Sequence, residues 1–337
     1  MSDIVVKLNY DSEMLNYIAS FLLIFVSGFS YGQSDEFLEM KALAESGDVE
    51  AQFYLAYMYE NGNEVPQNYK TAVKWYTKAA EQGLAEAQHN LANKYLNGEG
   101  VPKNDKTALK WYTKAAEQGY AKAGYILGVM YDFGEGVPQS DKTAVMWYRK
   151  AAEQGYAEAQ YNLGVRYGNG EGVKVHLKTA VMWVTKAAEQ GYAKAGYTLG
   201  VMYDIGEGVP QNDKTAVMWY SKAAEQGYAE ARYNLGVKYM IGKGVPQNYK
   251  TAVVWFTKAA EQGLAKAQHN LGFRYANGEG VLSSNVKAYM WFNLAAFNGY
   301  EDAAEGKDII SKQMTNEQIG RARDLSEACL AKNYKGC

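Results

Sequence analysis

The sequence predicts an all-α solenoid of seven 36-residue helix-turn-helix repeats with capping helices at both ends, and three observations predict it. The chain has 337 residues and seven tryptophans, each 36 residues after the one before. A glycine recurs eight residues after every tryptophan, and one further copy, Gly47, precedes them. Between these glycines, apolar side chains recur three and four residues apart in two stretches, as in two amphipathic helices. The tryptophans, expected in the core, are Trp75, Trp111, Trp147, Trp183, Trp219, Trp255 and Trp291.

The fourth repeat, residues 156–191, illustrates the unit. An apolar stripe from Ala159 to Tyr167 predicts a first helix, and the segment Asn169-Gly170-Glu171-Gly172 interrupts it. A second stripe runs from Ala180 to Ala188, and Gly191 ends that helix. Two such short helices cannot bury both apolar faces alone, so the repeats must stack.

The second helix of most repeats follows a residue that caps helix N-termini well. The fourth repeat departs from this pattern, with His176 in the capping position. In the other repeats the capping residues are Asn68, Asn104, Ser140, Asn212, Asn248 and Ser284.

The domain boundaries follow from the period. Residues 48–299 form the seven repeats, which are numbered in order below, and residues 33–47 match a lone second helix that caps the N-terminal end. Residues 300–337 form C-terminal capping helices and a tail. In that region Thr315 and Gln318 form a predicted capping box, which opens a last helix.

The N-terminal segment, residues 1–32, predicts a signal peptide. Its apolar run Tyr17–Val26 is about ten residues long, as in a signal peptide and short of the ~20 that span a bilayer. Small residues at positions 30 and 32 favour cleavage before Gln33, and export to the periplasm or the medium. Alternatives are an uncleaved inner-membrane anchor over residues 14–31, which would be the only membrane contact, and a buried helix of the cap. Met14 is an alternative start.

Charge and cysteine content exclude several classes of protein. The net charge is −2, and one base and three acids among the first 32 residues leave the remainder neutral, so no nucleic-acid partner is expected. The two cysteines, Cys329 and Cys337, are too few for a zinc site made of thiolates, and no metal is expected. In an oxidising compartment we expect them to form a disulfide.

These motifs resemble the Sel-like repeat family, which is related to tetratricopeptide repeats. The pattern A-x-A-x-x-x-L-G-x-x-Y-x-x-G-x-G-V, followed by K-x-A-x-x-W-Y-x-K-A-A-x-x-G, recurs through about residues 48–299 with few departures, such as Ala56 and Glu64 in place of glycine. The resemblance implies a right-handed superhelix whose inner wall is formed by the first helix of each repeat. It also implies a non-enzymatic scaffold or adaptor in a bacterial envelope.

No catalytic constellation is evident, and no cofactor is expected. His89 and His269 occupy a first-helix register that is Phe or Tyr in the other repeats, which indicates aromatic packing, and His176 stands alone in a loop. The segment from Ser284 to Lys287 matches the S-x-x-K of penicillin-recognising enzymes, but it lies in the helix-capping register without the companion motifs. The alternative is that the protein is a secreted hydrolase or β-lactam-binding enzyme of the cysteine-rich Sel-like type.

Two registers of the first helix, four residues apart, alternate along the chain and suggest a peptide-binding wall. An amide can bond a peptide backbone, and a base can pair with a carboxylate. Recent duplication would produce the same alternation, because residues 120–133 and 192–205 differ at two positions only. The polar pairs are Asn90/Lys94, Asn162/Arg166, Asn234/Lys238 and Asn270/Arg274, and the predicted sites for apolar peptide side chains are Ile126/Met130 and Thr198/Met202.

Overall fold

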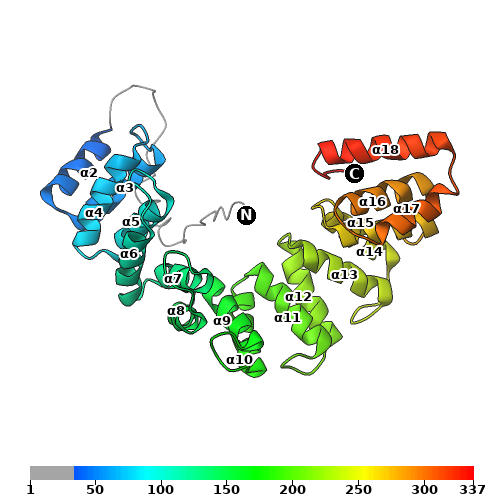
Figure 1. Ribbon diagram of the computed structural model, residues 1–337, viewed down its shortest axis with the longest axis horizontal. Helices are drawn as coiled ribbons and strands as arrows, with labels where there is room; N and C mark the ends of the chain where they lie inside the picture. Colours follow the sequence, from blue (N-terminus) through cyan, green and yellow to red (C-terminus); the bar gives the residue numbers. More distant parts are fainter. Residues whose placement is uncertain (1–33) are drawn as a thin grey trace.

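The computed structural model describes residues 34–337, which form seventeen α-helices and no strand. The helices follow one another along an open arc, with α2 (Asp35–Ser46) at one end and α18 (Asn316–Ala331) at the other (Figure 1). Each helix contacts mainly its neighbours in the sequence. This arrangement confirms the predicted all-α solenoid.

Each repeat consists of two antiparallel helices of 12 or 13 residues. In the lower part of Figure 1 the first helices α7 and α9 lie on the inner side of the arc and the second helices α8 and α10 on the outer side. The first helices are α3 (Val49–Asn61), α5 (Ala85–Asn97), α7 (Ala121–Phe133), α9 (Ala157–Asn169), α11 (Ala193–Ile205), α13 (Ala229–Ile241) and α15 (Ala265–Asn277). The second helices are α4 (Tyr69–Glu81), α6 (Asp105–Glu117), α8 (Asp141–Glu153), α10 (Leu177–Glu189), α12 (Asp213–Glu225), α14 (Tyr249–Ala260) and α16 (Asn285–Phe297).

Side-chain caps start the second helices. At each predicted capping position the side chain accepts a hydrogen bond from the backbone N–H three residues later, as Asn104 does from Thr107. His176 takes the same role in the fourth repeat, because its Nδ1 lies 3.1 Å from the backbone nitrogen of Thr179. The departure in sequence therefore keeps the cap.

Glycine in the loop between the two helices allows successive repeats to approach. Gly172 has φ +70°, and a Cβ at this position would lie 2.4 Å from the carbonyl oxygen of Asp141, the first residue of α8 in the preceding repeat. The first repeat has Glu64 at the equivalent position, also with positive φ. Its carboxylate accepts a hydrogen bond from the hydroxyl of Ser34, which caps α2.

The core is a row of small clusters, each shared by neighbouring repeats. Trp183 is 9% exposed and packs in one cluster with Ala144 and Tyr148 of the third repeat and with Ala159 of its own. A methyl group on Gly128 would lie 2.4 Å from the Tyr148 ring, so this small residue makes room for the ring. Of the other tryptophans, Trp75, Trp147, Trp219 and Trp291 are buried, and Trp111 and Trp255 are half-buried.

Helices cap both ends of the stack. At the N-terminal end α2 buries Phe37 and Ala44 against α3. At the C-terminal end α17 (Ala303–Ser311) and α18 follow the last repeat, and the predicted capping box of Thr315 and Gln318 at the start of α18 is present.

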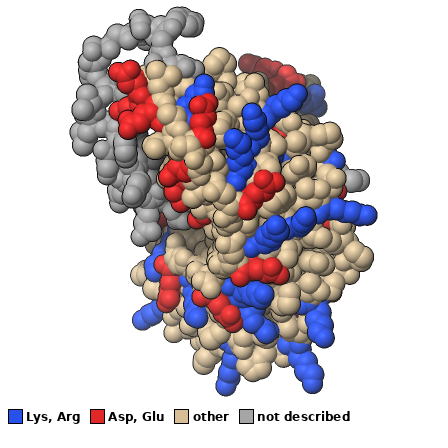
Figure 2. Space-filling model, turned by 90° about the vertical axis from the view of Figure 1, so that its left-hand side faces the viewer, with Lys and Arg blue, Asp and Glu red and all other residues tan. Residues whose placement is uncertain are grey.

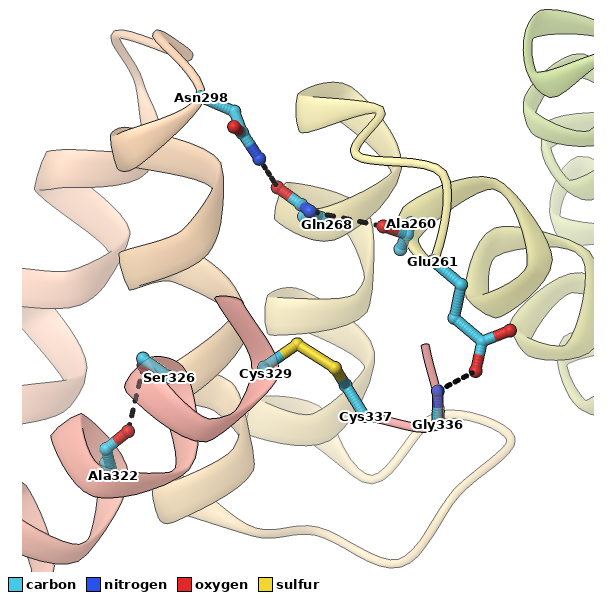
Figure 3. The surroundings of a disulfide bond; sticks show 9 residues. All are labelled: Ala260, Glu261, Gln268, Asn298, Ala322, Ser326, Cys329, Gly336 and Cys337. Carbon is cyan, nitrogen blue, oxygen red and sulfur yellow. Dashed lines mark hydrogen bonds between the residues drawn. A yellow bond between two sulfur atoms is a disulfide. The ribbon is translucent and has the colours of Figure 1, made fainter. Parts of the chain in front are cut away.

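A disulfide between Cys329 and Cys337 closes the C-terminal tail onto α18 (Figure 3). Two further contacts hold the tail: the Tyr334 hydroxyl lies 2.8 Å from the Asn298 side-chain oxygen, and the Gly336 N–H donates to Glu261 at 3.1 Å. The tail therefore connects α18 with the ends of α14 and α16.

The predicted signal peptide, residues 1–32, and the alternative anchor, residues 14–31, lie outside the described residues. Within residues 34–337, no helix combines the length and the apolar character that crossing a membrane requires.

Candidate functional site

The polar pairs predicted on the first helices lie at contacts between neighbouring repeats. The asparagines are half-buried. The bases four residues later are more enclosed, with 3% of the side chain exposed for Lys94, 17% for Arg166, 5% for Lys238 and 13% for Arg274. These bases therefore belong more to the body of the solenoid than to its surface.

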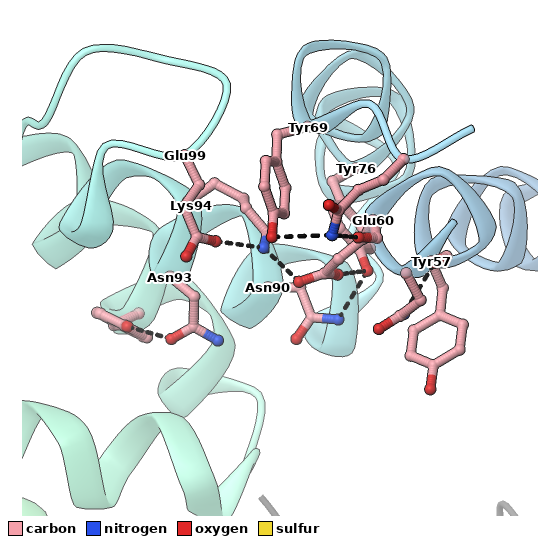
Figure 4. Close-up of polar contacts among 11 residues, drawn as sticks. Tyr57, Glu60, Tyr69, Tyr76, Asn90, Asn93, Lys94 and Glu99 are labelled. Carbon is pink, nitrogen blue, oxygen red and sulfur yellow. Dashed lines mark hydrogen bonds and ion pairs between the residues drawn. The ribbon is translucent and has the colours of Figure 1, made fainter. Parts of the chain in front are cut away.

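The surroundings of Lys94 show why a buried base is stable there (Figure 4). Its ammonium pairs with Glu60, in the last turn of α3 in the preceding repeat, and at 2.6 Å with Glu99 of its own loop. The ammonium also lies 4.9 Å from the centre of the Tyr69 ring. Burial opposes the charged form, but the hydrogen bonds to Glu60 and Glu99 outweigh it, so the pKa of Lys94 is raised.

Two further bases bridge repeats in the same way. Arg166 pairs with Asp132 of the third repeat, and Lys238 pairs with Asp204 of the fifth. The acids lie in the first, third and fifth repeats and the bases in the second, fourth and sixth. Each ion pair therefore links an odd-numbered repeat to the repeat that follows it. Each of these two bases has a second carboxylate partner: Glu171 for Arg166, and Asp213 at 2.6 Å for Lys238.

Arg274 in the seventh repeat differs from the other bases. The preceding repeat has Met240 where an acid would be, and among residues 34–337 Arg274 forms an ion pair with Glu279 of its own loop alone, at 2.5 Å. Its buried Nε has no hydrogen-bond partner among the described residues. Arg274 is thus the base whose hydrogen-bonding capacity is least used.

The predicted apolar positions fall in the same layer. Met130 and Met202 occupy the register of the bases and are 1% and 6% exposed, so they fill the space that a base fills elsewhere. Ile126 and Thr198 are half-buried. Of these four positions, only Ile126 and Thr198 are within reach of a ligand on the inner wall.

The asparagines contact tyrosine hydroxyls of neighbouring helices. The side-chain amide of Asn90 lies 3.3 Å from the Tyr76 hydroxyl, and that of Asn270 lies 3.4 Å from the Tyr233 hydroxyl. Asn162 and Asn234 make similar contacts, with Tyr125 and with Tyr197 and Tyr220. Each amide is partly exposed, so it can take part in binding.

A row of aromatic rings that sequence analysis did not assign to the site runs along these helices. The tyrosine before each of α9, α11 and α13 packs against a tyrosine of the preceding first helix, with ring centres 5.2–5.5 Å apart in the pairs Tyr125–Tyr156, Tyr161–Tyr192 and Tyr197–Tyr228. The signal was present in the sequence, because these tyrosines recur every 36 residues. We call Tyr125, Tyr156, Tyr161, Tyr192, Tyr197 and Tyr228, with Asn162 and Asn234, the tyrosine wall.

Charges of alternating sign lie along the tyrosine wall. Burial, reinforced by neighbouring tyrosines and acids, raises the pKa of Tyr192 and of Tyr228 to about 12. Glu158 and Glu230 raise the pKa of nearby tyrosines, whereas the Lys194 ammonium lies 5.1 Å from the centre of the Tyr161 ring. The wall therefore offers hydroxyl donors together with both signs of charge.

The histidines and Ser284 have structural surroundings. Burial, with a smaller effect of Lys122, lowers the pKa of His89 to about 3, and its ring packs against Tyr112 and Tyr120. Ser284 accepts a hydrogen bond from the Lys287 backbone N–H at the start of α16. Over residues 34–337, no group of three or more His, Cys, Asp or Glu side chains is placed to hold a metal ion.

The model of the Sel1 repeat family matches seven consecutive segments: residues 49–84, 85–120, 121–156, 157–192, 193–228, 229–264 and 265–300. The chain belongs to the Sel1 repeat family. Helical scaffolds built from Sel1 repeats typically take part in protein–protein interactions.

Solved structures of Sel1 repeat proteins resemble this one. A Sel1 repeat protein from Oxalobacter formigenes is 31% identical, with a TM-score of 0.66, over 86% of this chain and 98% of that one. A protective antigen of uropathogenic Escherichia coli with an SLR fold is 31% identical, with a TM-score of 0.44, over 88% of this chain and 80% of that one. The comparison with curated proteins finds no significant match.

Proposed function

We propose that this Sel1 repeat protein is a non-enzymatic scaffold that binds an extended segment of a partner protein along the inner side of its arc. The observation that carries the proposal is the tyrosine wall, which continues from the third repeat to the sixth. Tyr161 is buried, but the other five tyrosines of the wall are partly exposed. Such tyrosines supply a large contact area at low conformational cost, and their hydroxyls can bond a peptide backbone.

The asparagines of the wall suit a peptide backbone. A side-chain amide donates and accepts hydrogen bonds, so Asn162 and Asn234 can each bond a backbone N–H and C=O. Glu158 and Lys194, on successive first helices, supply charges that can select the side chains of the bound segment.

The bases have a second role in this proposal. A peptide carboxylate would replace an exposed carboxylate at a base: Glu171 is 41% exposed beside Arg166, and Glu279 is 35% exposed beside Arg274. At Arg166 the inter-repeat partner Asp132 would stay in place. Arg274 would accept such a carboxylate most readily, because no acid of another repeat pairs with it in the described part of the chain.

A peptide library tests this function. For a binder found by fluorescence anisotropy, Asn162→Ala combined with Arg166→Ala should weaken binding at least about tenfold, since each charge-assisted hydrogen bond is worth roughly 1.5–3 kcal/mol. The control pair, Gln139→Ala with Lys174→Ala, changes exposed loop residues and should have little effect. A library without any binder that depends on Asn162 or Arg166 contradicts the proposal.

We also propose that the protein acts after export, in a bacterial envelope. The apolar segment Tyr17–Val26 and the Cys329–Cys337 disulfide support this location, because disulfides persist in oxidising compartments. Mass spectrometry of the protein from its host should find an N-terminus near Gln33. Protein with an intact Met1 in a cytoplasmic fraction would contradict the proposed export.

A further inference from the structure

The second helices of the third to sixth repeats share an exposed apolar register. Met146, Met182, Met218 and Val254 lie 36 residues apart on α8, α10, α12 and α14, and their exposed fractions are 43%, 45%, 44% and 51%. Equivalent positions of successive repeats stack along a solenoid. These four residues therefore form a row of large apolar side chains, which we call the outer row.

Lysines border the outer row on both sides. Each of its residues has a lysine four positions before it and another four positions after it, as Lys178 and Lys186 flank Met182 on the same face of α10. The Lys186 ammonium lies 4.4 Å from the centre of the Trp183 ring, and the equivalent lysines of the neighbouring repeats repeat this contact. An apolar row thus runs between two basic rows.

The first two repeats differ, because Lys74 and Lys110 occupy the register of the outer row. Figure 2 views the molecule from the side where these repeats lie, and lysine and arginine side chains project from that face between smaller groups of acids. The apolar character of the register is therefore confined to the later repeats.

The seventh repeat shows what can cover this register. Its equivalent residue, Met290, is 3% exposed because α18 lies against α16, and it shares a cluster with Cys329 and Leu330 of α18. The lysine that follows in other repeats is replaced by Leu294, which is also buried. In this chain, a helix with an apolar face already packs on the register that the outer row leaves open.

We propose that the outer row binds an amphipathic helix of a partner protein, with an apolar ridge flanked by acidic side chains. Flexible methionines adapt to such a ridge, and the two lysine rows would pair with its acidic flanks. The inference rests on the scaffold function proposed above and adds a second binding surface, on the second helices, whereas the tyrosine wall lies along the first helices.

The binding of designed helical peptides to the whole protein tests this inference. One peptide carries a leucine ridge with glutamate flanks, and its matched control carries lysine flanks. We expect the glutamate-flanked helix to bind at least about tenfold more tightly than the control, with affinity that falls as salt rises. Combining Met146→Ser, Met182→Ser and Met218→Ser should weaken binding at least about tenfold, and these exposed positions allow the fold to be kept, as a melting curve would verify.

Several outcomes would overturn the inference. Equal binding of the two peptides, or unchanged binding by the triple methionine variant, would show that the outer row does not select an acidic helix. Binding lost in Asn162→Ala but kept in the methionine variant would place the helix on the tyrosine wall. Binding to phosphatidylglycerol vesicles through the outer row, without binding the peptide, would assign the row to a lipid surface. Failure of the scaffold function would be seen separately, in the extended-peptide library.

Discussion

Lys94 of the second repeat forms an ion pair with Glu60 of the first, across a separation of 34 residues in the sequence. The same separation joins Arg166 to Asp132 and Lys238 to Asp204. Because the acid and the base lie in different repeats, these contacts fix the stacking of one repeat on the next.

Removing one partner of this contact should destabilise the protein. Lys94→Met leaves Glu60 and Glu99 without their cation and should lower the free energy of unfolding by about 2 kcal/mol, less than the ~3–5 kcal/mol of a fully buried pair because both acids reach solvent. Adding Glu60→Leu should restore most of the loss, since Met and Leu occupy these registers in other repeats. A double-mutant cycle in urea measures both effects. Simple addition of the two losses would show that the residues are not coupled.

The loop glycines should differ in sensitivity according to their surroundings. Gly172→Ala combines a left-handed backbone with a Cβ 2.4 Å from the Asp141 carbonyl oxygen, and we expect a loss of about 3 kcal/mol or more. Gly155 is the matched control: its φ is +88°, but a Cβ there has open space, so Gly155→Ala should cost only about 1–2 kcal/mol. Equal losses in denaturant melts would mean that the loop shifts freely.

Acid should destabilise the protein partly through His89. The folded pKa is about 3 and the ordinary value is 6.5, so the unfolded chain takes up a proton first as pH falls below 6.5. The neutral histidine's contribution is fully present above pH 6.5 and should fall by about 2–3 kcal/mol by pH 4.5. The variant His89→Phe carries the residue that the first repeat has at this position, and it should lose less stability over this pH range than the wild type.

Reduction of the Cys329–Cys337 disulfide should loosen the C-terminal cap. Opening so short a loop costs roughly 2–3 kcal/mol, and the tail contacts of Tyr334 and Gly336 should weaken with it. Hydrogen exchange should become faster in α18, whereas α3 to α12 should be unaffected. A Cys329→Ser, Cys337→Ser variant should not respond to reductant. Unchanged exchange in α18 on reduction would show that packing alone holds the cap.

Most of the fold could be predicted from the 36-residue period of the sequence. The capping positions were predictable because their chemistry is local: a residue such as Asn104 needs only the helix that follows it. The two helices per repeat and the box of Thr315 and Gln318 were predictable for the same reason.

The candidate site was predictable only in part, because its contacts cross repeats. Helical spacing puts Asn90 and Lys94 on one face, but it does not say which neighbouring helix covers that face, and so Lys94 and Met130 were expected on the wall although both are buried. The Glu60 partner lies on another helix, and local spacing does not reveal it. Tyr192 repeats with the period of the core residues, so its place at the surface of the wall needed the structure.

The most direct test of the central claim is a crosslinking measurement in the host. A photoreactive residue is placed at Asn162 on the tyrosine wall or, as a control, at the exposed loop residue Lys174, and the linked proteins are identified by mass spectrometry. The account predicts that one partner protein is linked at position 162, through an extended segment, and that Tyr192→Phe combined with Asn234→Ala reduces this link. The same proteins linked equally at both positions, or no protein linked at position 162, would contradict the claim that the inner side of the arc binds a partner.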